Sequence, residues 1–191
     1  MLTILSQNTS DTNRDRAYAA MRARFATWSA VRDADVRELA DALRPGGLAE
    51  QKAPRISEVL RRLSADRGEP DLGWLAGLPP AEAMARLIEL PGVGVKTASC
   101  VLLFSLRVPV MPVDTHVRRV AARLGLIPSG MGAVAAHPVL TAATPPGRML
   151  EAHLLLIRHG RTTCVARRPR CGTCVLLDLC PYGRSPAAGP A

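Results

Sequence analysis

Apolar residues recur every three or four positions along most of this 191-residue chain. This spacing places them on one face of a helix, and no segment rich in β-branched residues alternates apolar and polar positions as a half-buried strand does. Helices are predicted over about 11–25, 36–43, 56–63, 80–88, 95–106, 115–124, 131–141 and 146–158. The pattern therefore predicts an all-α fold, and we expect the last residues, Ser185–Ala191, to be disordered.

The charge of the chain is unevenly distributed. The net charge is +9, and residues 1–108 hold 15 basic and 13 acidic groups, whereas residues 109–191 hold 10 and 3. Basic side chains displace the counterions condensed on phosphates, so a surplus concentrated in one half favours a nucleic-acid partner. A basic protein whose charge only keeps it soluble is the alternative. No run of 18 apolar residues and no signal-peptide pattern is present, so we expect a cytoplasmic protein without membrane spans.

The basic residues are almost all arginines. Lys52 and Lys96 are the two lysines, and the other 23 basic residues are arginines. Arginine stays protonated and delocalised, so it cannot act as an amine nucleophile. Each remaining lysine is therefore a candidate for a task that arginine cannot perform.

Residues 90–98, Leu-Pro-Gly-Val-Gly-Val-Lys-Thr-Ala, predict a tight turn between two helices. Glycines allow close backbone approach to a ligand, and the free amides that begin the second helix form an anion site. An ordinary helix–turn–helix connection is the alternative, but the flanking Leu-Pro and Lys-Thr-Ala favour a helix-hairpin-helix motif, at about 82–104, that binds a DNA phosphate. The residues expected to contact DNA here are Gly92, Gly94, Val95 and Thr97.

Lys96 and Asp114 are the candidate catalytic residues. Lys96 falls in the first turn of the second helix, where the positive helix end disfavours an ammonium, and burial would act in the same direction. Asp114, in Val-Asp-Thr-His, follows a turn broken by two prolines, and the return helix can bring it back across from Lys96. A plain helix cap is the alternative, but a rigidly held capping carboxylate could also stabilise a developing positive sugar.

Four cysteines lie within seventeen residues near the end of the chain, at Cys164, Cys171, Cys174 and Cys180. A disulfide set is disfavoured without a secretion signal, so the thiols predict a metal or cluster site. Zinc is one candidate, although its sites usually contain two tight Cys-x2-Cys pairs and only one is present. An iron–sulfur cluster is the other. Cys100 is expected to be a buried apolar residue outside this group.

Together, residues 90–98, Val-Asp-Thr-His, the His-Gly-Arg that begins at His159 and the 6-2-5 cysteine spacing resemble bacterial endonuclease III. The resemblance runs from about Leu2 to Pro181. It implies a two-lobed fold: a six-helix barrel with the hairpin, assigned to residues 1–108, and a lobe with the catalytic-Asp helix and a [4Fe–4S] cluster, assigned to residues 109–191. It also implies a bifunctional enzyme that removes damaged bases, with oxidised pyrimidines expected, from double-stranded DNA and cleaves abasic sites. We expect a monomer.

The resemblance also assigns roles to single residues. Lys96 matches the nucleophile that forms a Schiff base, and Asp114 matches the catalytic carboxylate; relatives with other base specificities place Ser or Tyr at the lysine position. Gln7 falls where the family fills the gap left by a flipped nucleotide, and Leu48 where an apolar wedge enters the opposite strand. A helix-end glutamine and a core leucine are the alternatives. The basic groups near the cluster expected to contact DNA are Arg161, Arg167, Arg168 and Arg170.

Three alternatives or departures remain. A DNA-binding paralogue that has lost turnover would lack the lysine or the aspartate, and both are present. A zinc-dependent DNA-binding module would be colourless, whereas an iron–sulfur protein is brown. Family members carry a further N-terminal stretch on the cluster domain, whereas this chain begins almost at Leu5-Ser6-Gln7, which we expect to affect stability more than mechanism.

Overall fold

The computed structural model of the chain describes residues 1–65 and 68–185. Within these ranges every regular element is helical and no strand forms, which confirms the all-α prediction. Disorder is expected at the C-terminal end, from Ser185 onward. The residues after Ser185 lie outside the described ranges. In the described part of the chain no helix combines the length and the apolar character that crossing a bilayer requires.

The chain divides into two compact units, Met1–Ala98 and a second unit that begins at Ser99. The division comes earlier than the boundary expected after residue 108. The reason is that Leu103, on the continuation of the hairpin's second helix, packs into the core of the second unit. The assignment of a six-helix barrel to the first unit stays a prediction.

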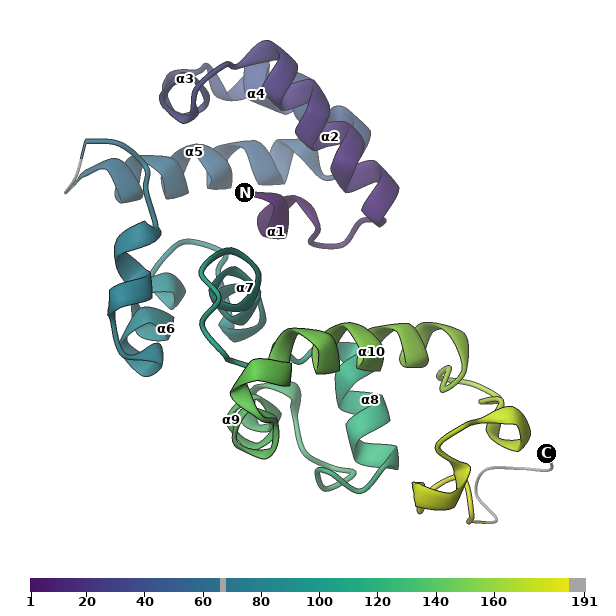
Figure 1. The fold of residues 1–191 in the computed structure, drawn as a ribbon. Helices are drawn as coiled ribbons and strands as arrows, with labels where there is room; N and C mark the ends of the chain where they lie inside the picture. Colours follow the sequence, from purple (N-terminus) through teal and green to yellow (C-terminus); the bar gives the residue numbers. More distant parts are fainter. Residues whose placement is uncertain (66–67, 186–191) are drawn as a thin grey trace. The chain divides into compact units, whose positions relative to one another are not determined.

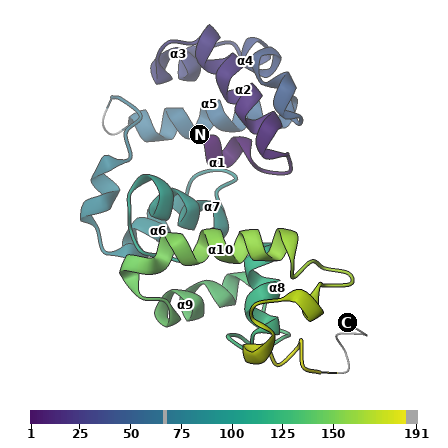
Figure 2. The ribbon, with the colours of Figure 1, turned by 45° about the vertical axis from the view of Figure 1, so that its right-hand side comes forward.

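The first unit is built around one long helix. Figures 1 and 2 show α5 (Ala49–Ala65) running beside α4 (Val36–Leu43), and α3 (Trp28–Asp33) also packs on α5. Their buried faces meet in a core that contains Met21, Leu39, Leu43, Ile56 and Leu60. The unit's remaining elements are α1 (Leu2–Leu5), α2 (Asp11–Arg24), η1 (Arg44–Gly46), η2 (Gly73–Gly77), α6 (Pro80–Ile88) and the start of α7 (Val95–Cys100).

The second unit is centred on a pair of helices. In Figures 1 and 2, α10 (Met149–Thr162) lies beside α8 (Thr115–Arg123), and α9 (Ala133–Ala143) contacts α8. The core between them includes Leu103, Met111, Val117 and Met149. The short elements are the π-helical η3 (Val101–Ser105), η4 (Pro146–Arg148), η5 (Cys171–Thr173) and η6 (Leu177–Leu179). From Arg161 to Ser185 no residue is buried.

Each predicted helix is present, with ends that differ by a few residues. The largest difference is at α5, which begins at Ala49 and not near Ile56, because its first turns carry polar residues that hide the apolar period. The apolar periodicity did not predict α1 or α3, which have four and six residues. A helix of that length is too short to show a helical period, so the Thr27 cap of α3 was its one available signal.

Candidate functional site

The predicted hairpin forms as a tight turn between α6 and α7. The amide of Val93 donates to the carbonyl of Leu90 at 3.1 Å, and Gly92 adopts a left-handed conformation with φ of 72°. A residue with a side chain would be strained at Gly92, both by this φ and by the Arg55 side chain that lies against it. Val93 is buried and anchors the turn in the first unit, while Gly94 is exposed and open to solvent.

Lys96 lies in the first turn of α7, as the motif predicted, and its side chain is exposed. The burial considered for Lys96 from the sequence is therefore not found in the described structure. Lys96 belongs to the first unit and Asp114 to the second, so their predicted approach stays a prediction.

Gln7 is tied to the hairpin by its side-chain amide. Its Nε2 donates to the carbonyl of Gly92 at 3.1 Å and lies 3.2 Å from Oγ1 of Thr97, and its Oε1 accepts from Nη1 of Arg55 at 3.1 Å. Thr97 is buried, so this contact joins the segment after α1 to the first turn of α7. Gln7 is thus more than a helix-end glutamine, and Arg55 is a partner that the sequence analysis missed.

Leu48 lies at a strained, exposed position just before α5. Its φ is 54°, a left-handed value that is rare for a residue with a branched side chain, and 43% of its surface is exposed. The alternative of a core leucine is therefore wrong. Strain of this kind persists where the surrounding structure imposes it, and it clusters at functional sites. The position fits an apolar tip aimed at a partner.

Asp114 is the N-cap of α8. Its Oδ1 accepts a hydrogen bond from the amide of Val117 at 2.8 Å, and the side chain is partly buried. In the described part of the chain its second carboxylate oxygen makes no hydrogen bond, so it is available for another role. The cap is confirmed, and it is compatible with the catalytic role that stays a prediction.

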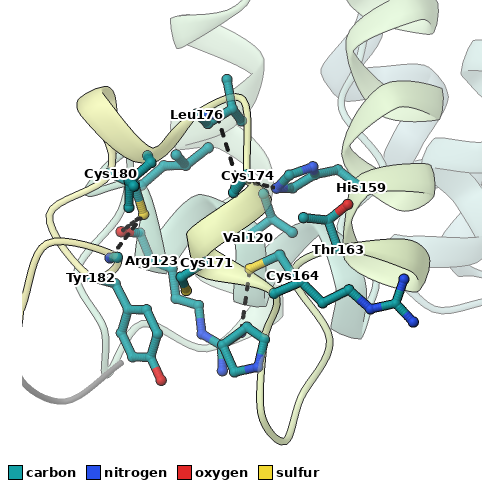
Figure 3. A pocket seen from close by; sticks show the side chains of 15 residues that line it. Val120, Arg123, His159, Thr163, Cys164, Cys171, Cys174, Leu176, Cys180 and Tyr182 are labelled. Atoms are coloured by element: carbon teal, nitrogen blue, oxygen red, sulfur yellow. Dashed lines mark hydrogen bonds between the residues drawn. The ribbon is translucent and has the colours of Figure 1, made fainter. Parts of the chain in front are cut away.

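All four predicted cysteines line one pocket of the second unit, shown in Figure 3. Each is a free, partly buried thiol, and Cys100 is buried elsewhere, as predicted. Partial burial raises the pKa of the Cys171 thiol, and the three neighbouring cysteine charges act in the same direction, so the four sulfur atoms share one electrostatic environment. Four free thiols that line one pocket are compatible with an iron–sulfur cluster, and the type of cluster stays a prediction.

Arg123, at the end of α8, holds both ends of the cysteine loop. Its Nη1 donates to Sγ of Cys164 at 3.3 Å and to the carbonyl of Val165 at 2.8 Å. Its own carbonyl accepts from the amide of Tyr182, whose ring lies 4.4 Å from the guanidinium carbon (Figure 3). No sequence signal distinguished Arg123 among 23 arginines.

Further contacts reach the sulfur atoms from the loop itself and from α10. The amide of Leu176 donates to Sγ of Cys174 at 3.4 Å, and the amide of Gly183 donates to Sγ of Cys180 at 3.3 Å. His159 Nε2 lies 3.6 Å from Sγ of Cys174, and partial burial lowers the pKa of this histidine. Hydrogen bonds of this kind are what cluster thiolates receive from a protein.

Gly160, the middle residue of the predicted His-Gly-Arg, allows α8 to approach α10 closely. A Cβ at Gly160 would lie 3.0 Å from Cβ of His116. Arg119 fixes the same contact, since its Nη2 donates to the carbonyl of Gly160 at 2.7 Å and its Nε donates to that of Cys164 at 3.0 Å. The motif therefore has a packing reason that links α8, α10 and the start of the cysteine loop.

The four arginines expected to contact DNA from this region are all exposed. Arg161 lies in the last turn of α10, and Arg167, Arg168 and Arg170 lie between the first two cysteines. Arg168 adopts a left-handed φ of 50°. Their exposure is compatible with phosphate contacts, and the contacts themselves stay a prediction.

Comparison with known proteins places this geometry in a family. Residues 1–135 match the HhH-GPD superfamily base excision DNA repair protein, and residues 164–180 match the iron–sulfur binding domain of endonuclease III. The chain is 39% identical over 158 residues to the putative DNA glycosylase At3g47830 of Arabidopsis thaliana, covering 83% of this chain and 54% of that relative. It therefore spans about half of that protein's length.

Two further similarities cover more of the relative. The chain is 33% identical over 184 residues to endonuclease III of Sulfolobus acidocaldarius, covering 95% of this chain and 80% of that protein. A solved endonuclease III, described as a trapped covalent intermediate with DNA in an estranged-adenine complex, superposes with a TM-score of 0.80 at 29% identity, covering 95% of this chain and 81% of the other. The chain belongs to the HhH-GPD superfamily of base excision DNA repair proteins, a family of DNA glycosylases.

Proposed function

We propose that this protein is a bifunctional DNA glycosylase and abasic-site lyase, which removes a damaged base, an oxidised pyrimidine in the first instance, from double-stranded DNA. The observation that carries the proposal is the exposed lysine, Lys96, in the first turn of the helix that follows the glycine hairpin. This chain uses arginine at 23 of its 25 basic positions, so a lysine at this point favours amine chemistry.

The proposed reaction begins when the damaged nucleotide is extruded from the duplex, which costs least for a weakened pair. The Lys96 amine attacks C1′ of the deoxyribose, and the bond between C1′ and the base breaks. The base leaves with a proton, the sugar ring opens, and the nitrogen retains C1′ as a Schiff base. Loss of a C2′ proton then expels the 3′ phosphate, and water releases the lysine for another turnover.

Asp114 is proposed to support the first of these steps. A carboxylate close to the sugar stabilises the positive charge that develops at C1′ as the base departs. The hydrogen bond from the Val117 amide holds one oxygen of Asp114 in a single orientation, while the other is left without a hydrogen bond among the described residues. A rigid carboxylate of this kind needs little reorganisation when the charge forms.

The cysteine pocket is proposed to hold a [4Fe–4S] cluster, with Cys164, Cys171, Cys174 and Cys180 as ligands. Four free thiols around one pocket and the amide donors to two of them support this assignment. When bound, the cluster would supply cross-linking of the loop and no redox step on the base. A cytoplasmic monomer that binds DNA through the hairpin and the basic loop completes the proposal.

Covalent trapping tests the proposed function directly. A duplex with one abasic site is incubated with the protein and sodium borohydride, which reduces a Schiff base to a stable amine. We expect a cross-linked band whose peptide map places the sugar on Lys96. Lys96→Gln should bind the same duplex and give no band. Equal trapping in the variant would reject Lys96 as the nucleophile.

The same assay separates the alternative functions. A protein that binds the duplex, gives no band and releases no base from a panel of duplexes with single lesions would be a DNA-binding paralogue without turnover. That panel would also identify the preferred lesion, since pocket shape sets the choice. Iron and acid-labile sulfide analysis would separate a cluster from zinc.

A further inference from the structure

The other lysine of the chain is a buried cation. Lys52 lies in the first turns of α5 and is 2% exposed. Its Nζ donates to the carbonyl oxygen of Leu5 at 2.9 Å and to that of Gly46 at 3.3 Å. Burial lowers the pKa of this amine, and in the described residues no carboxylate forms an ion pair with it. Its partners are therefore two backbone carbonyls.

These two carbonyls belong to segments that lie far apart in the sequence and carry candidate DNA contacts. Leu5 ends α1, two residues before Gln7, and Gly46 ends η1, two residues before Leu48. One turn further along α5, Arg55 donates to Oε1 of Gln7 at 3.1 Å. One face of α5 thus holds both segments through side-chain hydrogen bonds.

The choice of lysine at this position has a physical reason. An ammonium is a compact charge whose three donors can point at two converging carbonyls, whereas a guanidinium is planar, larger and suited to a fork-shaped partner. Burying a cation carries a desolvation cost, and an apolar side chain of similar volume is often as stable or more stable at such sites. Stability alone is therefore a weak reason for a lysine here, and its two carbonyl partners point to the geometry of the segments that carry them.

Leu48 gives the second reason to expect an anchor here. Its left-handed φ of 54° is unfavourable for leucine and persists only if the neighbouring backbone is held. The hydrogen bond from Nζ of Lys52 to the carbonyl of Gly46 holds the chain two residues before the strained position. The bond of 2.9 Å from the Lys52 amide to the carbonyl of Leu48 is the first backbone bond of α5 and does not depend on the side chain. The lysine side chain thus anchors the segment that leads into this tip.

We propose that Lys52 is a positioning residue for base extrusion: it holds the Gln7 segment and the Leu48 tip in a fixed relation, so that both enter the duplex together. This inference rests on the proposed function, because it takes Gln7 and Leu48 to be the residues that enter DNA. It assigns no contact with DNA to Lys52 itself. The predicted consequence is a defect limited to steps that open a duplex.

The test compares two substrates with Lys52→Met, which keeps an unbranched side chain one atom shorter and removes the charge and the donors. The rate of abasic-site cleavage is measured in a duplex and in a single strand, where no opening is needed. We expect the ratio of the duplex rate to the single-strand rate to fall about tenfold or more, since small misplacements of positioning groups cost this much. A second measurement follows 2-aminopurine opposite the abasic site, whose fluorescence should rise less with the variant at saturating protein.

Ser57→Ala is the matched control, because Ser57 is also buried on α5 and donates to a carbonyl, that of Arg32 at 3.1 Å. It should lower the melting temperature and leave the rate ratio unchanged. Lys52→Gln, a neutral side chain that retains N–H donors, is used if Lys52→Met does not fold, and we expect it to lower the same ratio. In a Gln7→Ala, Leu48→Ala background, the Lys52 substitution should have no further effect on the ratio.

An unchanged ratio in a folded Lys52 variant would overturn the proposal, and so would an equal fall in the Gln7→Ala, Leu48→Ala background. Failure of the proposed function gives a different result. If the unsubstituted protein cleaves neither substrate, it is not a lyase. The 2-aminopurine signal still decides the role of Lys52 in that case, because it reports opening without cleavage: a rise equal in the variant and the unsubstituted protein rejects the role.

Discussion

The two units present their candidate DNA contacts in opposite ways. In the first unit, side chains of α5 form hydrogen bonds to Gln7 and to the segment just before Leu48. The α5 residues Lys52 and Ile56 are almost fully buried. In the second unit the basic residues lie in a loop between Arg161 and Ser185 that contributes no buried residue. Val175 and Leu179, in this loop, are 91% and 73% exposed.

This difference indicates what each region needs in order to keep its shape. A segment held by buried hydrogen bonds and an apolar core keeps its geometry through the chain alone. A loop without buried apolar residues lacks that driving force and requires cross-links, which four thiolates on a cluster would supply. We therefore expect packing to order one contact region and the proposed cluster, once bound, to order the other.

Removing one cluster ligand should give the largest effect, confined to the second region. Cys171→Ser replaces a soft thiolate with a poor iron ligand, so we expect loss of the brown colour and rapid proteolysis at the arginines of the loop. Visible absorbance, iron content and limited proteolysis measure this, while hydrogen exchange should show the first unit's helices still protected. Cys100→Ser, which changes a buried cysteine outside the pocket, should keep its iron; full iron in Cys171→Ser would refute the cross-linking role.

The contrast also explains what could be predicted from the sequence. The helices and the cysteine pocket followed from period and spacing, because apolar repeats and thiol clusters are local features of a chain. The contacts of Arg123 and Lys52 could not be found in this way. Each reaches carbonyls far away in the sequence, and a carbonyl has no residue type that would mark it. The exposure of Leu48 was equally hidden, since a leucine before a helix is as consistent with a core as with a tip.

Asp114 belongs to the second unit, but it caps α8, a helix that packs into that unit's core, and does not lie in the cysteine loop. Asp114→Asn retains an oxygen that can cap α8, so the free energy of unfolding should change by less than about 1 kcal/mol. The lost negative charge should lower the rate of base excision by about a hundredfold or more. Thermal unfolding and single-turnover excision measure the two effects. A variant that loses its fold while its folded fraction excises at the normal rate would show that Asp114 is only a cap.

The basic loop offers a smaller and more specific test. Replacing Arg167, Arg168 and Arg170 together with Gln should leave the visible absorbance intact, since none of them is a proposed ligand of the cluster. Binding should weaken alike for all DNA sequences, and the slope of log K against log salt should fall by roughly one for each phosphate that the loop no longer neutralises. Fluorescence anisotropy at several salt concentrations measures this. Unchanged affinity and slope would mean that the ordered loop does not touch DNA.

The smallest expected effect concerns the close packing of α10 on α8 at Gly160, within the second unit. Alanine favours a helix over glycine by about 1 kcal/mol, but its Cβ would lie 3.0 Å from Cβ of His116 and 3.4 Å from Cα of the same residue, and neither atom can move without the backbone of α8. Overpacking of this kind costs roughly 1 to 3 kcal/mol, so we expect a net loss of about 1 kcal/mol and a melting temperature lower by a few degrees. Gly147→Ala, where a Cβ meets nothing within 4 Å, is the matched control. A Gly160→Ala variant as stable as that control would show that α8 and α10 can separate without cost, and the hydrogen bonds of Arg119 would then carry their attachment.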